Sequence, residues 1–112
     1  MTLFHAYQDR GLTRDLVITD TNGDTITPGV SDKVRVMIGR EGEAMKLSVV
    51  NDAPTVNGST LTKGASNRLR LDATDLTTFE PGTYTLFFSM MDNADAAEWK
   101  EVSRQVFHLE PS

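Results

Sequence analysis

The chain has 112 residues, a formal net charge of −5 at pH 7 and no cysteine. This length suits one domain with one core, and the missing cysteines exclude disulfides, thiolate nucleophiles and cysteine-based metal sites. The acidic charge argues against sequence-independent binding to nucleic acid, and the chain lacks the run of about twenty apolar residues that a membrane span needs. We therefore expect a single domain over residues 1–112 that binds neither nucleic acid nor membranes.

Apolar residues recur with a period of two along most of the chain, as in strands with one buried face. Val34, Val36 and Ile38 alternate with polar or larger neighbours in the clearest example. Four arginines, Arg35, Arg40, Arg68 and Arg70, are interpreted as solvated residues of the outer strand faces, and a local basic patch is the alternative. The pattern predicts about seven strands, at residues 2–8, 12–19, 33–39, 45–50, 67–72, 83–91 and 98–109.

The last predicted strand changes parity along its length. Val102 and Val106 share one face, whereas Phe107 and Leu109 share the other, which indicates either a bulge or a strand buried on both sides. Between the strands, the Asn22-Gly23 pair predicts a tight hairpin. Residues 51–67 read as a long polar connection, and residues 92–97 as at most one helical turn.

A corner precedes the predicted strand at 83–91. Pro81 fixes φ for a turn, Gly82 can adopt a positive φ, and Tyr84 follows at a point where its hydroxyl can bond back to upstream backbone. This arrangement resembles the tyrosine corner of immunoglobulin-like domains, with residues 68–71 as strand E and residues 75–82 as the E–F corner. The resemblance implies an all-β fold, an Ig-like antiparallel β-sandwich, and says nothing of activity.

The resemblance has two departures. Leu86 stands where antibody domains place the second disulfide cysteine, so a hydrophobic contact with Leu16 or Ile18 is expected instead. Val36 occupies the region of the usual strand-C tryptophan, and the one tryptophan, Trp99, opens the last strand.

Candidate chemistry is sparse. His5 and His108 lie near opposite ends of the chain, and they could meet if the first and last strands are neighbours, but zinc needs a third or fourth ligand. Two acidic loops could share one end of a sandwich and hold calcium; they contain Asp20, Asn22 and Asp24, and Asp92, Asn93 and Asp95. The alternative is two polar hairpin tips. No nucleophile–base set or phosphate-binding loop is present, so we expect no enzyme activity, no cofactor and no metal.

The strand residues expected to point outward indicate a protein interface instead. Met37, Phe87 and Met91 fall on a face that solvent should wet, with Val102 or Val106 beside them. A contiguous exposed apolar stripe usually marks a protein interface. The alternative is that residues 3–7 fold over this face and cover it.

Several segments resemble small tailed-bacteriophage virion proteins, in the style of the N-terminal domain of baseplate upper proteins. They are Tyr7-Gln8-Asp9-Arg10-Gly11, residues 15–20, Gly23-Asp24, Gly82-Thr83-Tyr84 and Phe107-His108-Leu109. The resemblance implies a non-catalytic structural protein of the virion, foremost a capsid decoration or cement protein, otherwise a tail or baseplate adaptor. Its partners would be other virion proteins, and it would be a homo-oligomer in the particle.

The expected location is the virion, after assembly in the host cytoplasm. The lack of cysteine and of a basic, apolar leader segment favours a chain that folds in a reducing compartment. The rival interpretation is an extracellular Ig-like binding module for calcium or a glycan. Glycan sites usually present aromatic platforms, and Trp99 alone lies near a predicted loop.

Overall fold

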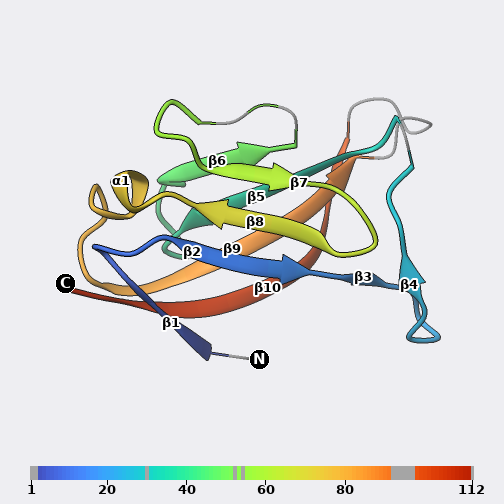
Figure 1. The fold of residues 1–112 in the computed structure, drawn as a ribbon. Helices are drawn as coiled ribbons and strands as arrows, with labels where there is room; N and C mark the ends of the chain where they lie inside the picture. The colour runs from blue at the N-terminus through green and yellow to red at the C-terminus, as the bar shows by residue number, and fades with distance from the viewer. Residues whose placement is uncertain (1–2, 30, 52, 54, 92–97, 112) are drawn as a thin grey trace.

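The computed structural model describes residues 3–29, 31–51, 53, 55–91 and 98–111. This part of the chain forms two larger β-sheets that pack face to face, with a two-stranded ribbon at one end (Figure 1). The bounds of the elements are β1 Leu3–Tyr7, β2 Leu12–Leu16, β3 Ile18–Thr19, β4 Thr25–Ile26, β5 Lys33–Gly39, β6 Leu47–Val50, β7 Thr60–Thr62, β8 Asn67–Leu71, α1 Ala73–Leu76, β9 Gly82–Met91 and β10 Trp99–Glu110.

The sheet order is that of an immunoglobulin-like sandwich. The five-stranded sheet has the order β1-β10-β9-β5-β6, and the three-stranded sheet has the order β2-β8-β7. In the usual strand letters, β10, β9, β5 and β6 correspond to G, F, C and C′, and β2, β8 and β7 correspond to B, E and D. The all-β sandwich predicted from the sequence is confirmed. The described helix α1 has four residues, so no helix here has the length that crossing a bilayer requires.

One strand pair departs from the predicted antiparallel arrangement. β1 runs parallel to β10, with Leu3 opposite Val106 and Tyr7 opposite Glu110, whereas the other pairs are antiparallel. The reason is that the chain changes sheets immediately after β1. β2 belongs to the opposite sheet, so β1 is free to pair with a strand that comes much later in the chain.

The predicted strand boundaries agree best with the observed ones where apolar and polar residues alternate most regularly. The prediction at 33–39 matches β5, but the predicted strand at 12–19 is divided at Val17, where the hydrogen-bonding partner changes from β8 to β4. β4 and β7 were not predicted, and β7 lies within the segment read as a connection. Among the described apolar residues of that segment, Leu61 is buried and Val56 is fully exposed.

The predicted hairpin and bulge are both present. The backbone N–H of Asp20 donates to the carbonyl of Asp24 at 2.9 Å, and Gly23 takes the positive φ of +86° that the Asn-Gly turn requires. In the last strand, the pairing of β10 with β9 shifts between Glu101 and Ser103. The shift lets Phe107 and Leu109 turn into the core while Trp99 and Glu101, before the shift, point to the outer face.

The core lies between the two larger sheets. It receives alternate residues of β5, β9 and β10 from one side and of β2, β8 and α1 from the other. Leu16, Ile18 and Leu86 all belong to this cluster, and Val36 is fully buried at the place expected of the strand-C tryptophan. Each large apolar side chain buried here contributes about 1.5–3 kcal/mol, which holds the sheets together without a covalent bridge.

The E–F corner is locked by Tyr84. Its hydroxyl donates to the carbonyl oxygen of Glu80 at 2.5 Å, and this is the bond back to upstream backbone that the corner was expected to form. The ring packs between Phe79 and Phe107, with centroids 5.2 and 5.8 Å away. Gly82 has φ +147°, and a Cβ there would lie 2.8 Å from Nη2 of Arg40. Burial raises the pKa of Tyr84, so the hydroxyl remains a donor.

Asp75 ties the same corner to the connection before β7. Its carboxylate is buried and accepts hydrogen bonds from Thr55 Oγ1, Asn57 Nδ2 and Ser59 Oγ. Burial acts to raise the pKa of Asp75, but the three donors outweigh it and the pKa lies below its usual value. The polar segment at 55–59 is therefore held by one carboxylate in place of an apolar anchor.

Candidate protein interface

The outer face of the five-stranded sheet is the candidate site. Residues 34, 36 and 38 of β5 and 84, 86 and 88 of β9 point into the core, so the residues between them point outward. The strand register sets two neighbouring rows across this face. One row contains Arg35, Ser89 and Glu101, and the next contains Met37, Phe87 and Arg104.

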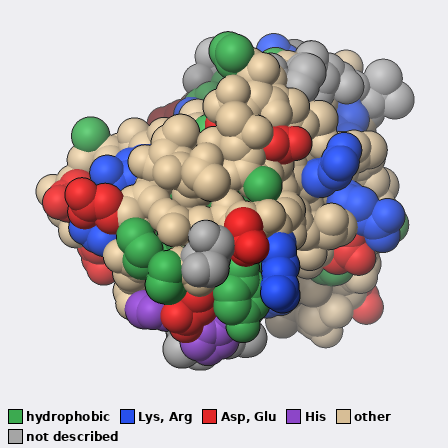
Figure 2. All heavy atoms as spheres, turned by 60° about the vertical axis from the view of Figure 1, so that its left-hand side comes forward, with side chains coloured by type: hydrophobic (Ala, Val, Ile, Leu, Met, Phe, Trp, Pro, Cys, Tyr) green, Lys and Arg blue, Asp and Glu red, His purple; other side chains and the backbone are tan. Residues whose placement is uncertain are grey.

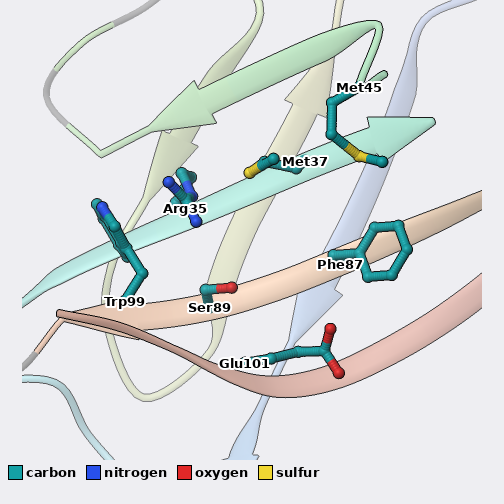
Figure 3. A pocket seen from close by; sticks show the side chains of 7 residues that line it. All are labelled: Arg35, Met37, Met45, Phe87, Ser89, Trp99 and Glu101. Carbon is teal, nitrogen blue, oxygen red and sulfur yellow. The ribbon is translucent and has the colours of Figure 1, made fainter. Parts of the chain in front are cut away.

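These rows enclose a shallow groove of about 280 Å³ on β5, β9 and β10 (Figure 3). Its floor is Ser89, which is buried although it belongs to the outward row. In Figure 3, Met37 and Met45 lie on one side of the groove, and Phe87 and Glu101 lie on the other. The full lining is Arg35, Met37, Met45, Phe87, Ser89, Trp99 and Glu101.

The five residues predicted for an interface are only partly brought together. Met37 and Phe87 stand directly opposite each other and both line the groove. Met91 lies further along β9, opposite Trp99 and Lys33, and is half-buried. Val106 lies opposite Thr85, away from the groove, and Val102 is 37% exposed at the bulge.

The alternative that the N-terminal segment covers this face is wrong. β1 lies at the edge of the sheet beside β10, where it extends the face by one strand. Its inward residue Phe4 stacks on Phe107 at 5.2 Å between ring centroids. The groove over β5 and β9 is therefore left uncovered by residues 3–7.

Arg35 and Trp99 are two of the groove residues that the sequence analysis did not assign to the interface. The Arg35 guanidinium lies over the Trp99 ring, 4.3 Å from its centroid, and so the indole reaches across β9 from β10. The Arg35 Nε is buried and has no hydrogen-bond partner among the described residues. Burial lowers the pKa of Arg35. The interpretation of Arg35 as a solvated outer residue is wrong, because its register position brings it under an aromatic ring.

The other three arginines that were predicted to be solvated are not all alike. Arg40 is also half-buried and lies over the Tyr84 ring at 4.9 Å, whereas Arg68 and Arg70 are exposed on β8 as expected. An arginine next to a buried aromatic can cover apolar surface with its planar head. The sequence offers no signal for this, since the aromatic partner belongs to another strand.

Arg104 is a second arginine beside the groove, next to Phe87 in the strand register. Its guanidinium lies 5.0 Å from the Phe87 ring centroid, and its Nε donates to Glu101 Oε2 at 2.7 Å. Glu41 Oε1 lies 3.5 Å from the same guanidinium. The hydrogen bond with Glu101 is the main reason that the pKa of Arg104 is raised. Arg104 is thus neutralised locally, in contrast to Arg35.

The structure brings the two histidines together, as neighbouring first and last strands allow. His5 and His108 are register partners on β1 and β10, and their ring centroids are 5.9 Å apart. Glu110 Oε1 lies 3.2 Å from His5 Nδ1 and 3.7 Å from His108 Nε2. Figure 2 shows the two histidines gathered with acidic side chains at one end of the molecule.

No metal site follows from these residues. Within the described ranges, no group of three or more His, Asp or Glu side chains has the arrangement that a metal ion needs. The Asp20 carboxylate accepts from the backbone N–H groups of Asn22 and Asp24 at 2.8 and 3.0 Å, so it stabilises its own turn. The second half of the calcium hypothesis, Asp92, Asn93 and Asp95, lies outside the described residues.

Comparisons with known proteins add no further assignment. No protein-family model matches the chain, and no curated protein is found to be similar to it. The candidate interface must therefore be interpreted from its own geometry.

Proposed function

We propose that this chain is a non-catalytic structural protein of a bacteriophage virion that uses the outer face of its five-stranded sheet to bind protein. The observation that supports a binding role is the groove lined by Met37, Met45, Phe87 and Trp99 on a face not covered by the described chain. Methionine, aromatic residues and arginine are the side chains enriched at the centres of protein interfaces.

The size of the groove favours side chains of a protein partner over a small-molecule ligand. Its volume of about 280 Å³ is below the 300–1,000 Å³ range of typical ligand pockets. It is also shallow and lies on a sheet face, which suits the insertion of one or two side chains. The apolar surface around it continues to Met91, so the contact surface would exceed the groove.

The virion part of the proposal depends on the resemblance of the sequence segments named above. An Ig-like sandwich is compatible with that role but is shared by many unrelated proteins. We place capsid decoration first, with partners among the capsid proteins, and a tail or baseplate adaptor second. Both roles require a protein-binding surface and no catalytic group.

Two measurements test this proposal. Mass spectrometry of purified virions from the source should detect the chain at a fixed ratio to the major capsid or tail protein. The Phe87→Ser variant should fold but be depleted from particles, because it removes the aromatic centre of the face. Absence of the chain from virions, or normal incorporation of Phe87→Ser, would remove the virion role or the assigned surface respectively.

Trp99 supports a second candidate, an extracellular Ig-like module that binds a glycan. Its indole lines the groove, and sugar rings stack on such aromatic surfaces. Titration with a panel of soluble oligosaccharides, followed by tryptophan fluorescence, would show saturable quenching in that case. The calcium version of this candidate predicts a rise in melting temperature with added calcium.

A further inference from the structure

We propose that the occupant of this outer face is a second copy of the same chain, paired about a two-fold axis that runs parallel to β9. This inference rests on the proposed function, since it identifies the partner of the surface assigned there. Three features of the face carry it: an arginine without an acceptor, a carboxylate at the mirror position, and aromatic rings near the axis.

Arg35 is the first feature. Its guanidinium forms no ion pair with a described residue, and its buried Nε finds no acceptor. The chain has an excess of acidic residues, with sixteen Asp and Glu against eleven Lys and Arg. Trp99 stacks on the Arg35 guanidinium, but no carboxylate in the described part of the chain neutralises its charge. A half-buried arginine in such a chain is costly unless a carboxylate is supplied.

Glu101 stands at the mirror position of Arg35. Both are opposite Ser89 in the strand register, Arg35 on the β5 side and Glu101 on the β10 side. A two-fold axis parallel to β9 and passing above Ser89 exchanges these two sides. Face-to-face pairing about that axis brings Arg35 of each copy opposite Glu101 of the other. Each contact is therefore formed twice, as an isologous interface requires. Because Glu101 Oε2 already accepts from Arg104 Nε of its own chain at 2.7 Å, Oε1 is the oxygen that would receive Arg35 of the second copy.

The residues nearest the axis are apolar or small. Phe87 lies on β9 itself, so it faces the same residue of the second copy. Trp99 reaches across β9 toward Arg35, which brings its ring close to the axis as well. Met37 and Met45 border the groove, and their flexible side chains can fill the remaining space. The result is an apolar centre flanked by two charge pairs, the usual anatomy of an interface.

Charge reversal tests the pairing directly. In sedimentation velocity over a range of concentrations, the wild-type chain should form a dimer. Arg35→Glu and Glu101→Arg should each weaken self-association about tenfold or more, because each homodimer then contains two pairs of like charges. An equimolar mixture of the two variants should restore the dimer, since every contact again joins Arg and Glu. The double variant Arg35→Glu/Glu101→Arg should also dimerise.

Arg70→Glu is the matched control. It makes the same change of charge as Arg35→Glu, but at an exposed position of β8 on the opposite sheet. This variant should dimerise as the wild type does. Circular dichroism and melting temperature establish that each variant is folded. A wild-type chain that is monomeric throughout, or a mixture that stays monomeric while both variants are folded, would overturn the pairing.

Failure of this inference can be told from failure of the proposed function. If the purified chain is monomeric but Phe87→Ser is depleted from virions, the surface binds another virion protein and the two-fold pairing is wrong. If the mixture restores the dimer but virions lack the chain, the pairing stands and the virion role is wrong.

Discussion

Single side chains at the E–F corner join segments that the strands alone would leave loose. Tyr84 links β9 to the carbonyl of Glu80, and the Asp75 carboxylate holds three donors from residues 55–59. Both groups are buried, so each loses water when the chain folds and must recover the lost interactions from the protein. Two substitutions test these contributions.

Tyr84→Phe should lower the free energy of unfolding by about 1 kcal/mol. The ring still packs between Phe79 and Phe107, but the Glu80 carbonyl loses its donor. Urea denaturation measures the change. Tyr7→Phe is the control, because Tyr7 is 41% exposed and should give a change near zero. An unchanged midpoint for Tyr84→Phe would show that the corner bond contributes nothing.

Asp75→Asn should lower the free energy of unfolding at pH 7 by about 2 kcal/mol, since the donors around it bind a carboxylate most strongly. The pKa of Asp75 is lowered in the folded state, so its contribution is complete above the unfolded value of about 3.9 and is lost as pH falls through the folded pKa. The difference between wild type and variant should therefore shrink in acid. Urea melts at several pH values, with Asp9→Asn as control, measure it; a pH-independent difference would contradict this account.

At the scale of elements, β1 and β10 show how pairing order decides which side chains meet. β1 adds to the edge of the five-stranded sheet, and alternate residues then face opposite ways. Phe4 and Ala6 turn inward toward Phe107 and Leu109, whereas His5 turns outward beside His108. The docking of β1 should accordingly depend on its inward side chains and not on the histidines.

Phe4→Ala should destabilise the fold by about 2 kcal/mol or more, because it removes a ring that stacks on Phe107. The same ring also contacts the Arg14 guanidinium, which lies 4.0 Å from its centroid. His5→Ala on the same strand should change stability by less than about 0.5 kcal/mol, as for other exposed positions. Thermal and urea unfolding of both variants make the comparison. Equal effects from the two would mean that β1 is not held by its inward face.

At the scale of the whole molecule, adjacent residues of β9 belong to different surfaces. Phe88 is fully buried in the core, and Phe87 lies on the outer face beside Met37. A single strand thus carries both the stability of the sandwich and the proposed interface. The period of two in a strand allows the two roles to be separated by mutation.

Phe88→Ser should cost about 4 kcal/mol or unfold the chain, because it creates a cavity and buries an unpaired hydroxyl. Phe87→Ser should leave the melting temperature within a few degrees of wild type while weakening self-association in sedimentation velocity. Loss of folding in Phe87→Ser would show that this ring belongs to the core and would remove the separation of roles.

Much of the fold could be predicted from local patterns. The alternation at 33–39 defines β5, the Asn22-Gly23 pair defines a hairpin, and the parity change after Val102 indicates the bulge. β7 was missed because it has one buried apolar residue, Leu61, and is held by pairing to β8. For the candidate site, the search for apolar residues on the outward side of the strands found Met37 and Phe87. It did not assign Arg35, Trp99 or Met45 to the interface.

The amino-acid order by itself determined which residues alternate, where glycine and proline turn the chain, and hence that the protein is a β-sandwich. These properties depend on backbone geometry over a few residues, so they can be read locally. Only the tertiary structure decided that Trp99 reaches Arg35, that His5 meets His108 and that Glu101 mirrors Arg35 about Ser89. Those contacts follow from the register between strands far apart in the chain, and register is fixed by the packing of the whole core.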